Sequence, residues 1–250
     1  MYTLKKSLGQ HFLKDETICR RIVDSVTETP FRRLLEVGPG GGALTKYLVN
    51  LEGIDFKAVE LDEEKITFLL RTYPSLDGKL IHASILEMAP PFADNFTIVG
   101  NFPYNISTQI LFRVLEWKDR VEAVTGMFQK EVAQRTAARE GSKTYGILSV
   151  LVQTFFDVTY LFEVDEQAFT PPPKVKSAVI RLLPRKDIPA FRSEEHLFRL
   201  VKTAFNQRRK MLRNAVRGLF SPEELADPLF DKRAEQLSVE DFCALTARMS

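Results

Sequence analysis

The sequence contains few of the residues that form disulfides or bind metal ions. Among its 250 residues there are two cysteines and three histidines, and Cys19 and Cys243 lie far apart with no histidine cluster beside them. A disulfide framework or a zinc site is therefore not expected. No segment approaches the roughly 18 consecutive apolar residues of a membrane-spanning helix, and residues 1–16 lack the apolar core of a signal peptide. We expect a cytoplasmic, monomeric protein with neither a metal nor a membrane partner.

The net charge is small, +2, but the basic residues are unevenly distributed. Between residues 202 and 221 there is no acidic residue, and the basic ones are Lys202, Arg208, Arg209, Lys210, Arg213 and Arg217. A second basic group near the start of the chain contains Lys5, Lys6, Lys14, Arg20 and Arg21. Two local basic patches on a nearly neutral protein indicate a polyanionic partner. For either patch alone, a solvated helix face is the alternative.

Short apolar runs alternate with helical patterns over the first 130 residues. The runs predict strands at residues 33–38, 56–61, 79–84, 96–101 and 122–128. Apolar residues spaced by three and four predict amphipathic helices at residues 43–51, 63–73 and 107–117. Strands and helices that alternate in this way are typical of a parallel sheet covered by helices on both faces.

The second half of the chain has a different pattern. Strands are predicted at residues 154–163 and 175–183, where they would form an antiparallel edge on the parallel sheet. After Pro184 the pattern is helical, and from Leu197 it predicts an amphipathic helix whose basic face includes Arg209 and Arg213. The prediction is thus an α/β domain of residues 1–184 followed by a small all-α domain of residues 185–250.

A glycine-rich loop follows the first predicted strand. Residues 34–45 read LLEVGPGGGALT, and Glu60 stands at the end of the next strand, 22 residues after Gly38. Such a loop allows the backbone to approach a ligand closely, and a carboxylate at this spacing can accept hydrogen bonds from ribose hydroxyls. The pattern predicts a nucleoside-bearing cofactor. Spacing alone leaves a dinucleotide possible, whereas the E-x-G-x-G form that begins at Glu36 resembles the cofactor loop of class I S-adenosylmethionine-dependent methyltransferases.

The fourth predicted strand ends in the sequence Asn101-Phe102-Pro103-Tyr104. Pro103 fixes its own φ and favours an extended conformation at Phe102, so that the Phe102 carbonyl would point in a fixed direction. An amide oxygen, a carbonyl oxygen and a flat ring close together suit a flat ligand with an amino group. After a glycine loop and a strand-end acid, this sequence resembles the N-[LF]-P-Y motif of methyltransferases that act on adenine amino groups.

Three further stretches narrow the resemblance. They are SLGQHFLKD at residues 7–15, FTPPPKVKSAVIRL at residues 169–182 and AFNQRRKMLRN at residues 204–214. Together with the motif at residues 101–104, they resemble the bacterial small-subunit rRNA adenine N6,N6-dimethyltransferases from about residue 4 to the end of the chain. The resemblance implies a class I, Rossmann-like methyltransferase fold with S-adenosyl-L-methionine as cofactor and small-subunit rRNA, or an immature small subunit, as partner.

The resemblance also implies roles for individual residues. The cofactor-binding set would be His11, Leu13, Gly38, Glu60, Ser84 and Asn101. Ser84 stands where the family normally has an aspartate that binds the cofactor's adenine. The catalytic set would be Asn101, Phe102, Pro103, Tyr104 and Phe169. The RNA-binding set would be Lys5, Lys6, Lys202, Arg208, Arg209, Lys210 and Arg213.

The expected chemistry is positioning rather than proton abstraction. Asn101 Oδ1 and the Phe102 carbonyl would accept the two N6 hydrogens of adenine and direct its lone pair toward the methyl group. Tyr104 would stack on the base, with Phe169 on the opposite face. The structural alternatives are that Asn101 caps the next helix, that Tyr104 and Phe169 are core aromatics and that His11 is a surface residue. Glu36 would either order the loop or contact the cofactor's amine.

Three functions are compatible with these motifs. The favoured one is dimethylation of two adjacent adenosines in the 3′-terminal hairpin loop of small-subunit rRNA during ribosome biogenesis. The second is adenine methylation of large-subunit rRNA of the antibiotic-resistance type. The third is an RNA-binding ribosome assembly factor whose catalysis is secondary, a hypothesis to which Ser84 gives some weight.

Overall fold

A computed structural model describes residues 11–250. The chain forms two compact units. The first comprises the described residues up to Ala133 together with Thr159–Pro184, and the second comprises Gln134–Val158 and Arg185–Ser250. The division of the chain into domains of residues 1–184 and 185–250 stays a prediction.

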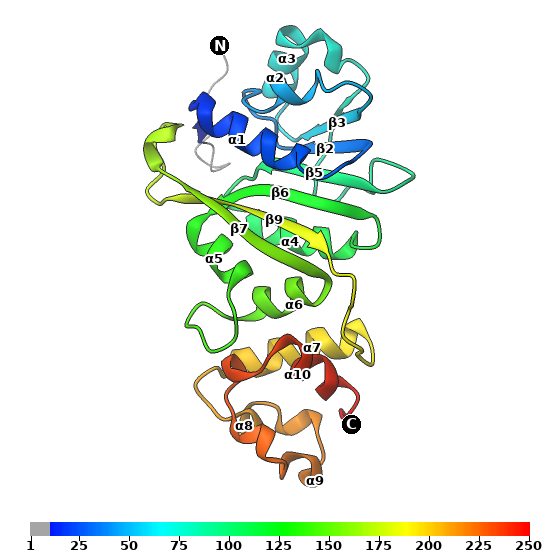
Figure 1. The fold of residues 1–250 in the computed structure, drawn as a ribbon, viewed down its shortest axis with the longest axis vertical. Helices are drawn as coiled ribbons and strands as arrows, with labels where there is room; N and C mark the ends of the chain where they lie inside the picture. Colours follow the sequence, from blue (N-terminus) through cyan, green and yellow to red (C-terminus); the bar gives the residue numbers. More distant parts are fainter. Residues whose placement is uncertain (1–10) are drawn as a thin grey trace. The chain divides into compact units, whose positions relative to one another are not determined.

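The first unit is built on a seven-stranded sheet (Figure 1) with the strand order β4-β3-β2-β5-β6-β9-β7. The strands β4, β3, β2, β5 and β6 are parallel, and β9 runs antiparallel to β6. This arrangement confirms the predicted fold class, a mostly parallel α/β sheet with an antiparallel edge. The strands are β2 (Arg33–Val37), β3 (Asp55–Glu60), β4 (Leu80–His82), β5 (Phe96–Asn101), β6 (Val121–Gln129), β7 (Phe156–Val164) and β9 (Ser177–Pro184).

The central strands are apolar along nearly their whole length. In β2, Leu34 and Leu35 are fully buried, and in β5 Phe96, Ile98 and Val99 are at most 1% exposed. A strand that is covered on both faces has no solvent side on which polar residues can alternate. This burial explains why these segments read as short continuous apolar runs in the sequence.

Helices follow the strands of the first unit as the spacing predicts. Residues 63–73 form α3 (Glu63–Thr72) and residues 107–117 form α4 (Ser107–Glu116). The predicted helix at 43–51 is wrong in extent, because α2 (Thr45–Leu48) has only four residues. The glycine loop takes the preceding positions, and Gly42 has φ +82°, which lies outside helical backbone.

Helix α1 (Glu16–Thr27) covers one face of the sheet against β6. Asp15 caps its start by accepting hydrogen bonds from the backbone N–H groups of Thr17 and Ile18 at 2.9 and 3.2 Å. Buried side chains recur at helical spacing along its inner face, namely Cys19, Ile22, Val23 and Val26.

A small second sheet was not predicted. Strands β1 (Phe12–Leu13) and β8 (Phe169–Thr170) pair antiparallel, with Phe12 opposite Thr170 and Leu13 opposite Phe169. The backbone N–H of Lys14 extends the pairing by donating to the Ala168 carbonyl at 2.9 Å. Two-residue strands carry no periodicity that a sequence pattern could reveal. This ladder holds residues 11–14 beside the main sheet.

The second unit is helical over most of its length and is described by itself. Its helices include α6 (Ile147–Phe155), α7 (Glu194–Asn206), α8 (Leu212–Ala215), α9 (Pro222–Leu225) and α10 (Val239–Thr246), and α5 (Lys130–Ala137) leads into it. Helices α6, α7 and α10 pack on one another.

Short 3-10 helices occur in both units. They include Pro74–Leu76, Glu166–Ala168, Arg217–Leu219, Pro228–Asp231 and Ala234–Gln236. None of the helices in residues 11–250 has the length and apolar character that a bilayer crossing requires.

The predicted basic helix face is corrected by the structure, because α7 ends at Asn206. The Lys210 N–H donates to the Gln207 carbonyl at 2.8 Å and closes a turn there. Met211 then pairs with Arg233 in an antiparallel bridge. Long-range pairing thus breaks the helix and places residues 208–210 on a turn.

The strand order determines where the site lies. From β2 the chain continues to β3 on one side, and β5 lies on its other side. At such a switch point the loops that leave the carboxyl ends of the two strands diverge and open a crevice. The glycine loop after β2 and the segment Asn101–Tyr104 after β5 therefore come together, although more than 60 residues separate them in the sequence.

Candidate active site

An open cavity lies at the carboxyl ends of β2 and β5. The space within it, including open solvent at its mouth, is about 940 Å³. Residues from the N-terminal arm (residues 11–14), the glycine loop, β3, α3 and the end of β5 surround it. They are His11, Phe12, Leu13, Gly38, Pro39, Gly40, Ala43, Leu44, Glu60, Leu61, Lys65, Asn101, Phe102, Pro103, Tyr104, Asn105 and Ile106.

The glycine loop presents backbone to this cavity. Gly38 and Gly40 have φ values of +69° and +57°. This left-handed region is strained for residues that carry a side chain. The Gly38 N–H donates to the Val59 carbonyl at 2.9 Å, which fixes the loop to the end of β3. The predicted role of Gly38 beside a ligand is thus compatible with its position.

Glu60 joins the glycine loop to the start of α3. Its Oε1 accepts hydrogen bonds from the backbone N–H groups of Leu61 and Asp62 at 3.0 Å each, and its Oε2 accepts one from Gly40 at 3.2 Å. The Lys65 ammonium lies 4.0 Å from the same Oε2. Glu60 is only 7% exposed, yet it lines the cavity. A carboxylate held in this way can still accept a hydrogen bond from a ligand hydroxyl, because its two oxygens offer about four lone-pair positions.

Glu36 belongs to the loop rather than to the cavity wall. It is 1% exposed, is absent from the lining and accepts a hydrogen bond from Thr45 Oγ1 at 2.8 Å. Burial raises the pKa of Glu36 to about 8, and the nearby charge of Glu60 adds to the shift. Of the two sequence-based hypotheses, the contact favours loop ordering: this carboxyl ties the end of β2 to the first turn of α2.

At the end of β5, the N–H groups of Asn101 and Phe102 have hydrogen-bond partners, whereas within residues 11–250 two of their oxygens do not. The Asn101 amide donates to the His11 carbonyl at 3.4 Å, and the Phe102 N–H donates to the Met127 carbonyl at 3.1 Å. No donor within residues 11–250 reaches Asn101 Oδ1 or the Phe102 carbonyl. The capping alternative is wrong for Asn101, because the N-cap of α4 is Ile106.

The ring of Tyr104 forms one wall of the cavity. Its hydroxyl hydrogen-bonds Ser177 Oγ, and burial raises its pKa above the ordinary value, so the phenol is neutral at physiological pH. The His11 ring lies almost parallel to it, with ring centroids 5.6 Å apart and planes inclined by 30°. His11 is held in turn by a 2.8 Å contact between Nδ1 and the Pro171 carbonyl. Both rings are therefore ordered parts of the site.

Two predicted site residues do not line the cavity. Phe169 is fully buried, because the β1–β8 ladder sets it opposite Leu13 and turns its ring into the core. Ser84 begins a turn after β4, where its hydroxyl accepts the Leu86 N–H at 3.3 Å. The core alternative therefore describes the position of Phe169, and cofactor contact by Ser84 stays a prediction.

Sequence reasoning missed several cavity residues, among which Lys65 is the most informative. Its ammonium lies beside the Glu60 carboxylate and 5.8 Å from the Phe12 ring centroid. The signal that could have found it is topological. Helix α3 starts three residues after Glu60, so its first turn must return toward the end of β3.

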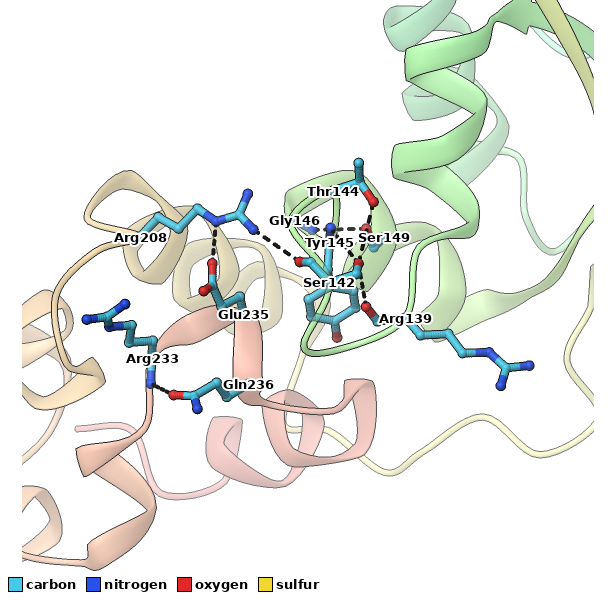
Figure 2. A network of polar contacts seen from close by, with 10 residues as sticks. All are labelled: Arg139, Ser142, Thr144, Tyr145, Gly146, Ser149, Arg208, Arg233, Glu235 and Gln236. Carbon is cyan, nitrogen blue, oxygen red and sulfur yellow. Dashed lines mark hydrogen bonds and ion pairs between the residues drawn. The ribbon is translucent and has the colours of Figure 1, made fainter.

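The predicted RNA-binding residues divide into three groups. Lys5 and Lys6 lie outside the described residues. In the second unit Lys202, Arg209 and Lys210 are exposed. Arg208 and Arg213 instead make internal contacts: Arg213 pairs with Asp231, and Arg208 donates to Glu235 Oε2 at 2.6 Å and to the Ser142 carbonyl at 3.2 Å. Figure 2 shows Arg208 between these two partners.

The Arg208 contacts order a loop of the second unit. The Gly141 N–H donates to the Glu235 backbone carbonyl at 2.7 Å, and Ser142 Oγ accepts the Tyr145 N–H at 3.2 Å. Arg208, Glu235 and this loop thus form one network (Figure 2). An RNA-binding role for Arg208 stays a prediction, and its side chain already has a structural role.

Known structures show which fold class this chain has. A dimethyladenosine transferase from Plasmodium falciparum superposes with a TM-score of 0.77 over 93% of this chain and 94% of that one, at 23% identity. The 23S rRNA methyltransferase ErmE superposes with a TM-score of 0.75 over 95% of this chain and 99% of that one, at 24% identity. At these identities the likeness concerns the fold, which is that of the class I, Rossmann-like methyltransferases.

Sequence comparison then shows the family. The family model described as ribosomal RNA adenine dimethylase matches residues 1–250, and the chain belongs to this family. A ribosomal RNA small subunit methyltransferase A from Cytophaga hutchinsonii is 50% identical, covering 98% of this chain and 97% of the relative. The protein of the same name from Bacteroides thetaiotaomicron is 51% identical, covering 97% and 92%. These findings confirm the predicted family.

The buried Glu36 carboxyl predicts a pH-dependent stability. The folded state holds its proton up to about pH 8, whereas the unfolded chain releases it near the ordinary value of 4.5. The contribution of Glu36 to stability is therefore present below pH 4.5 and falls as the pH rises toward 8. In Glu36→Gln, which mimics the protonated form, the unfolding free energy should exceed that of wild type by an amount that grows between pH 5 and 8, at about 1.4 kcal/mol per pH unit.

Urea denaturation at pH 5, 6.5 and 8 measures this difference. The exposed Glu52→Gln is the matched control and should follow wild type at each pH. A Glu36→Gln difference that is the same at pH 5 and pH 8 would show that this carboxyl is ionised in the folded protein.

Proposed function

We propose that this protein transfers methyl groups from S-adenosylmethionine to N6 of two adjacent adenosines in the 3′-terminal hairpin loop of small-subunit rRNA during ribosome biogenesis. The observation that supports the proposal is that Asn101 and Phe102, at the end of β5, line one cavity together with Glu60 and the glycine loop. The names of the curated relatives, about 50% identical over nearly the whole chain, support small-subunit rRNA as substrate.

The cavity suits the proposed cofactor. The Glu60 carboxylate is ordered by three backbone N–H groups and offers remaining lone pairs to ribose hydroxyls. Gly38 and Gly40 bring backbone to the cavity without side chains, and Leu61, which is 56% exposed, adds an apolar surface at its edge. His11 and Leu13 complete the wall. Bound S-adenosylmethionine supplies an electrophilic methyl group on a sulfonium centre.

Asn101 and Phe102 bind the acceptor amino group. The N6 lone pair of adenine is delocalised into the ring, which makes it a weak nucleophile. Two hydrogen bonds from the amino group to Asn101 Oδ1 and the Phe102 carbonyl favour a pyramidal nitrogen whose lone pair faces away from them. As the nitrogen becomes positive, the same dipoles stabilise the charge, so they bind the transition state better than the planar amine.

Tyr104 holds the plane of the base. A base that stacks on an aromatic side chain gains roughly 1–3 kcal/mol. The Ser177 hydroxyl fixes the Tyr104 ring from its far end. A paired adenine cannot reach such a wall, so the target is an unpaired or extruded base. Phe169 contributes to this arrangement only through the β1–β8 ladder that positions the arm.

The reaction needs no dedicated base in this scheme. The methylated nitrogen is strongly acidic before it loses its proton, and water suffices to accept it. For the second transfer one N6 hydrogen remains, so one of the two oxygens binds it and the other is dispensable. Both oxygens thus position the amino group in the first round, and one of them does so in the second.

Binding of rRNA involves the exposed basic residues of the second unit. Lys202, Arg209 and Lys210 are exposed on α7 and the turn that follows it. Such side chains bind phosphates and fix orientation, whereas the target base is selected by shape and by the cavity. The likeness to a large-subunit methyltransferase at 24% identity concerns the fold and does not favour that substrate.

The proposal predicts methyl transfer to small subunits. Undermethylated small subunits and separately large subunits are incubated with radiolabelled S-adenosylmethionine, and modified nucleosides are mapped. We expect N6,N6-dimethyladenosine at two adjacent positions of the small-subunit hairpin and no label in the large subunit. Label only in large-subunit RNA would support the second function, and RNA binding without label would support an assembly factor.

Asn101→Ala should lower the rate constant for methyl transfer at least 100-fold, as in the loss of a transition-state hydrogen bond. Affinity for rRNA should stay within about twofold, because the change removes no phosphate contact. Single-turnover kinetics and filter binding measure the two quantities. Asn95→Ala, an exposed asparagine just before the start of β5, is the control and should behave as wild type. A wild-type rate in Asn101→Ala would rule out this acceptor role.

Arg209→Ala combined with Lys210→Ala should weaken rRNA binding in a salt-dependent way. The slope of log K against log salt should become shallower by about 1.5, from two phosphate contacts. The exposed Lys186→Ala serves as a control for the general loss of charge. An unchanged slope in the double variant would show that this turn does not contact phosphate.

A further inference from the structure

Phe102 has a role that its position in the motif does not explain. Phe102 is among the residues that line the cavity, yet it is only 1% exposed, so its ring is buried. The ring packs against Phe128, with ring centroids 4.8 Å apart and planes inclined by 56°. A ring buried in the sheet restrains the peptide group that follows it.

Two paired glycines make the space for this ring. Gly100 in β5 lies opposite Gly126 in β6 in the parallel register. Neither has a positive φ, so neither is required by backbone conformation. Glycine in the middle of a strand weakens it relative to residues with side chains. The reason for glycine here must therefore be space.

The space above Gly126 is filled by Phe102. A Cβ atom at Gly126 would lie 2.8 Å from Cδ2 of Phe102, would overlap Cε2 of the same ring and would lie 2.8 Å from Cε2 of Phe128. The Phe102 ring is buried, with the residue 1% exposed, and it packs against Phe128. A methyl group at position 126 would have to displace the ring and, with it, the backbone between Asn101 and Pro103.

Gly100 differs in one respect. A Cβ atom there would lie 2.8 Å from Cε1 of Phe102 but also 2.6 Å from the Val37 carbonyl oxygen of β2. The second clash is with the backbone of the sheet, and no change at position 102 can relieve it. The two glycines can therefore be distinguished by substitution.

We infer that Gly126 is a positioning residue for methyl transfer, because the space that it leaves in β6 receives the Phe102 ring and thereby sets the Phe102 carbonyl at the amino group of the target adenine. The inference rests on the proposed function of that carbonyl. It makes residues 102 and 126 a size-matched pair: a smaller side chain at 102 should tolerate a larger one at 126.

A double-mutant cycle tests the pairing. We expect Gly126→Ala to lower kcat about 100-fold, the loss expected when a reacting group is displaced by about 1 Å, with KM for S-adenosylmethionine within twofold. Phe102→Leu, which removes the ring that the space above Gly126 receives, should itself lower kcat, but by less than Gly126→Ala does. Phe102→Leu combined with Gly126→Ala should recover at least tenfold over Gly126→Ala alone.

Gly100→Ala combined with Phe102→Leu is the matched control and should show no recovery over Gly100→Ala. Circular dichroism melting and the stoichiometry of S-adenosylmethionine binding correct each kcat for the folded fraction. If Gly126→Ala alone does not fold, Phe102→Leu/Gly126→Ala must fold and methylate to uphold the inference.

The positioning role is overturned if Gly126→Ala keeps the wild-type kcat, or if the two effects are additive so that Phe102→Leu gives no recovery. Failure of the proposed function gives a different result, because wild type itself would then leave small-subunit adenosines unmethylated.

Discussion

The sharp turn at the end of β5 is the constraint on which the site depends. The Phe102 ring is buried toward the sheet, the Phe102 N–H is bound to the Met127 carbonyl and the Asn101 amide is bound to the His11 carbonyl. Each of these contacts uses a donor or an apolar group. Within residues 11–250, Asn101 Oδ1 and the Phe102 carbonyl oxygen are left without a donor. Two such acceptors favour a ligand with an amino group, and the exocyclic amine of adenine has the two hydrogens that they can bind.

The other half of the cavity is ordered by carboxylates with separate tasks. Glu60 accepts hydrogen bonds from three backbone N–H groups and still lines the cavity, with the Lys65 ammonium beside it. Glu36 is buried behind the loop and bound to Thr45, and its raised pKa of about 8 keeps it largely neutral at physiological pH. One carboxylate therefore presents charge to a ligand, and the other orders the loop without adding a second charge a short distance away.

Much of the fold could be predicted from the sequence, because the parallel strands are continuous apolar runs and the glycine loop, Glu60 and residues 101–104 lie directly at their ends. Features that depend on long-range contacts could not. The β1–β8 ladder has two residues in each strand, and it is this ladder that turns Phe169 into the core. Helix α7 ends at Asn206 because the chain beyond pairs with residues 232 and 233, and the Arg208 contact to Glu235 crosses 27 positions of sequence. The sequence alone therefore grouped Arg208 with the other basic residues of the predicted RNA-binding set.

The most direct test of this account is a crystal structure of the protein with an adenosine nucleoside and a cofactor analogue bound in the cavity. The account predicts that the adenine amino nitrogen lies within hydrogen-bond distance, about 2.7–3.2 Å, of both Asn101 Oδ1 and the Phe102 carbonyl oxygen, with the base against the Tyr104 ring. An adenine whose amino nitrogen lies farther than about 4 Å from both oxygens, or a base bound away from Tyr104, would contradict it.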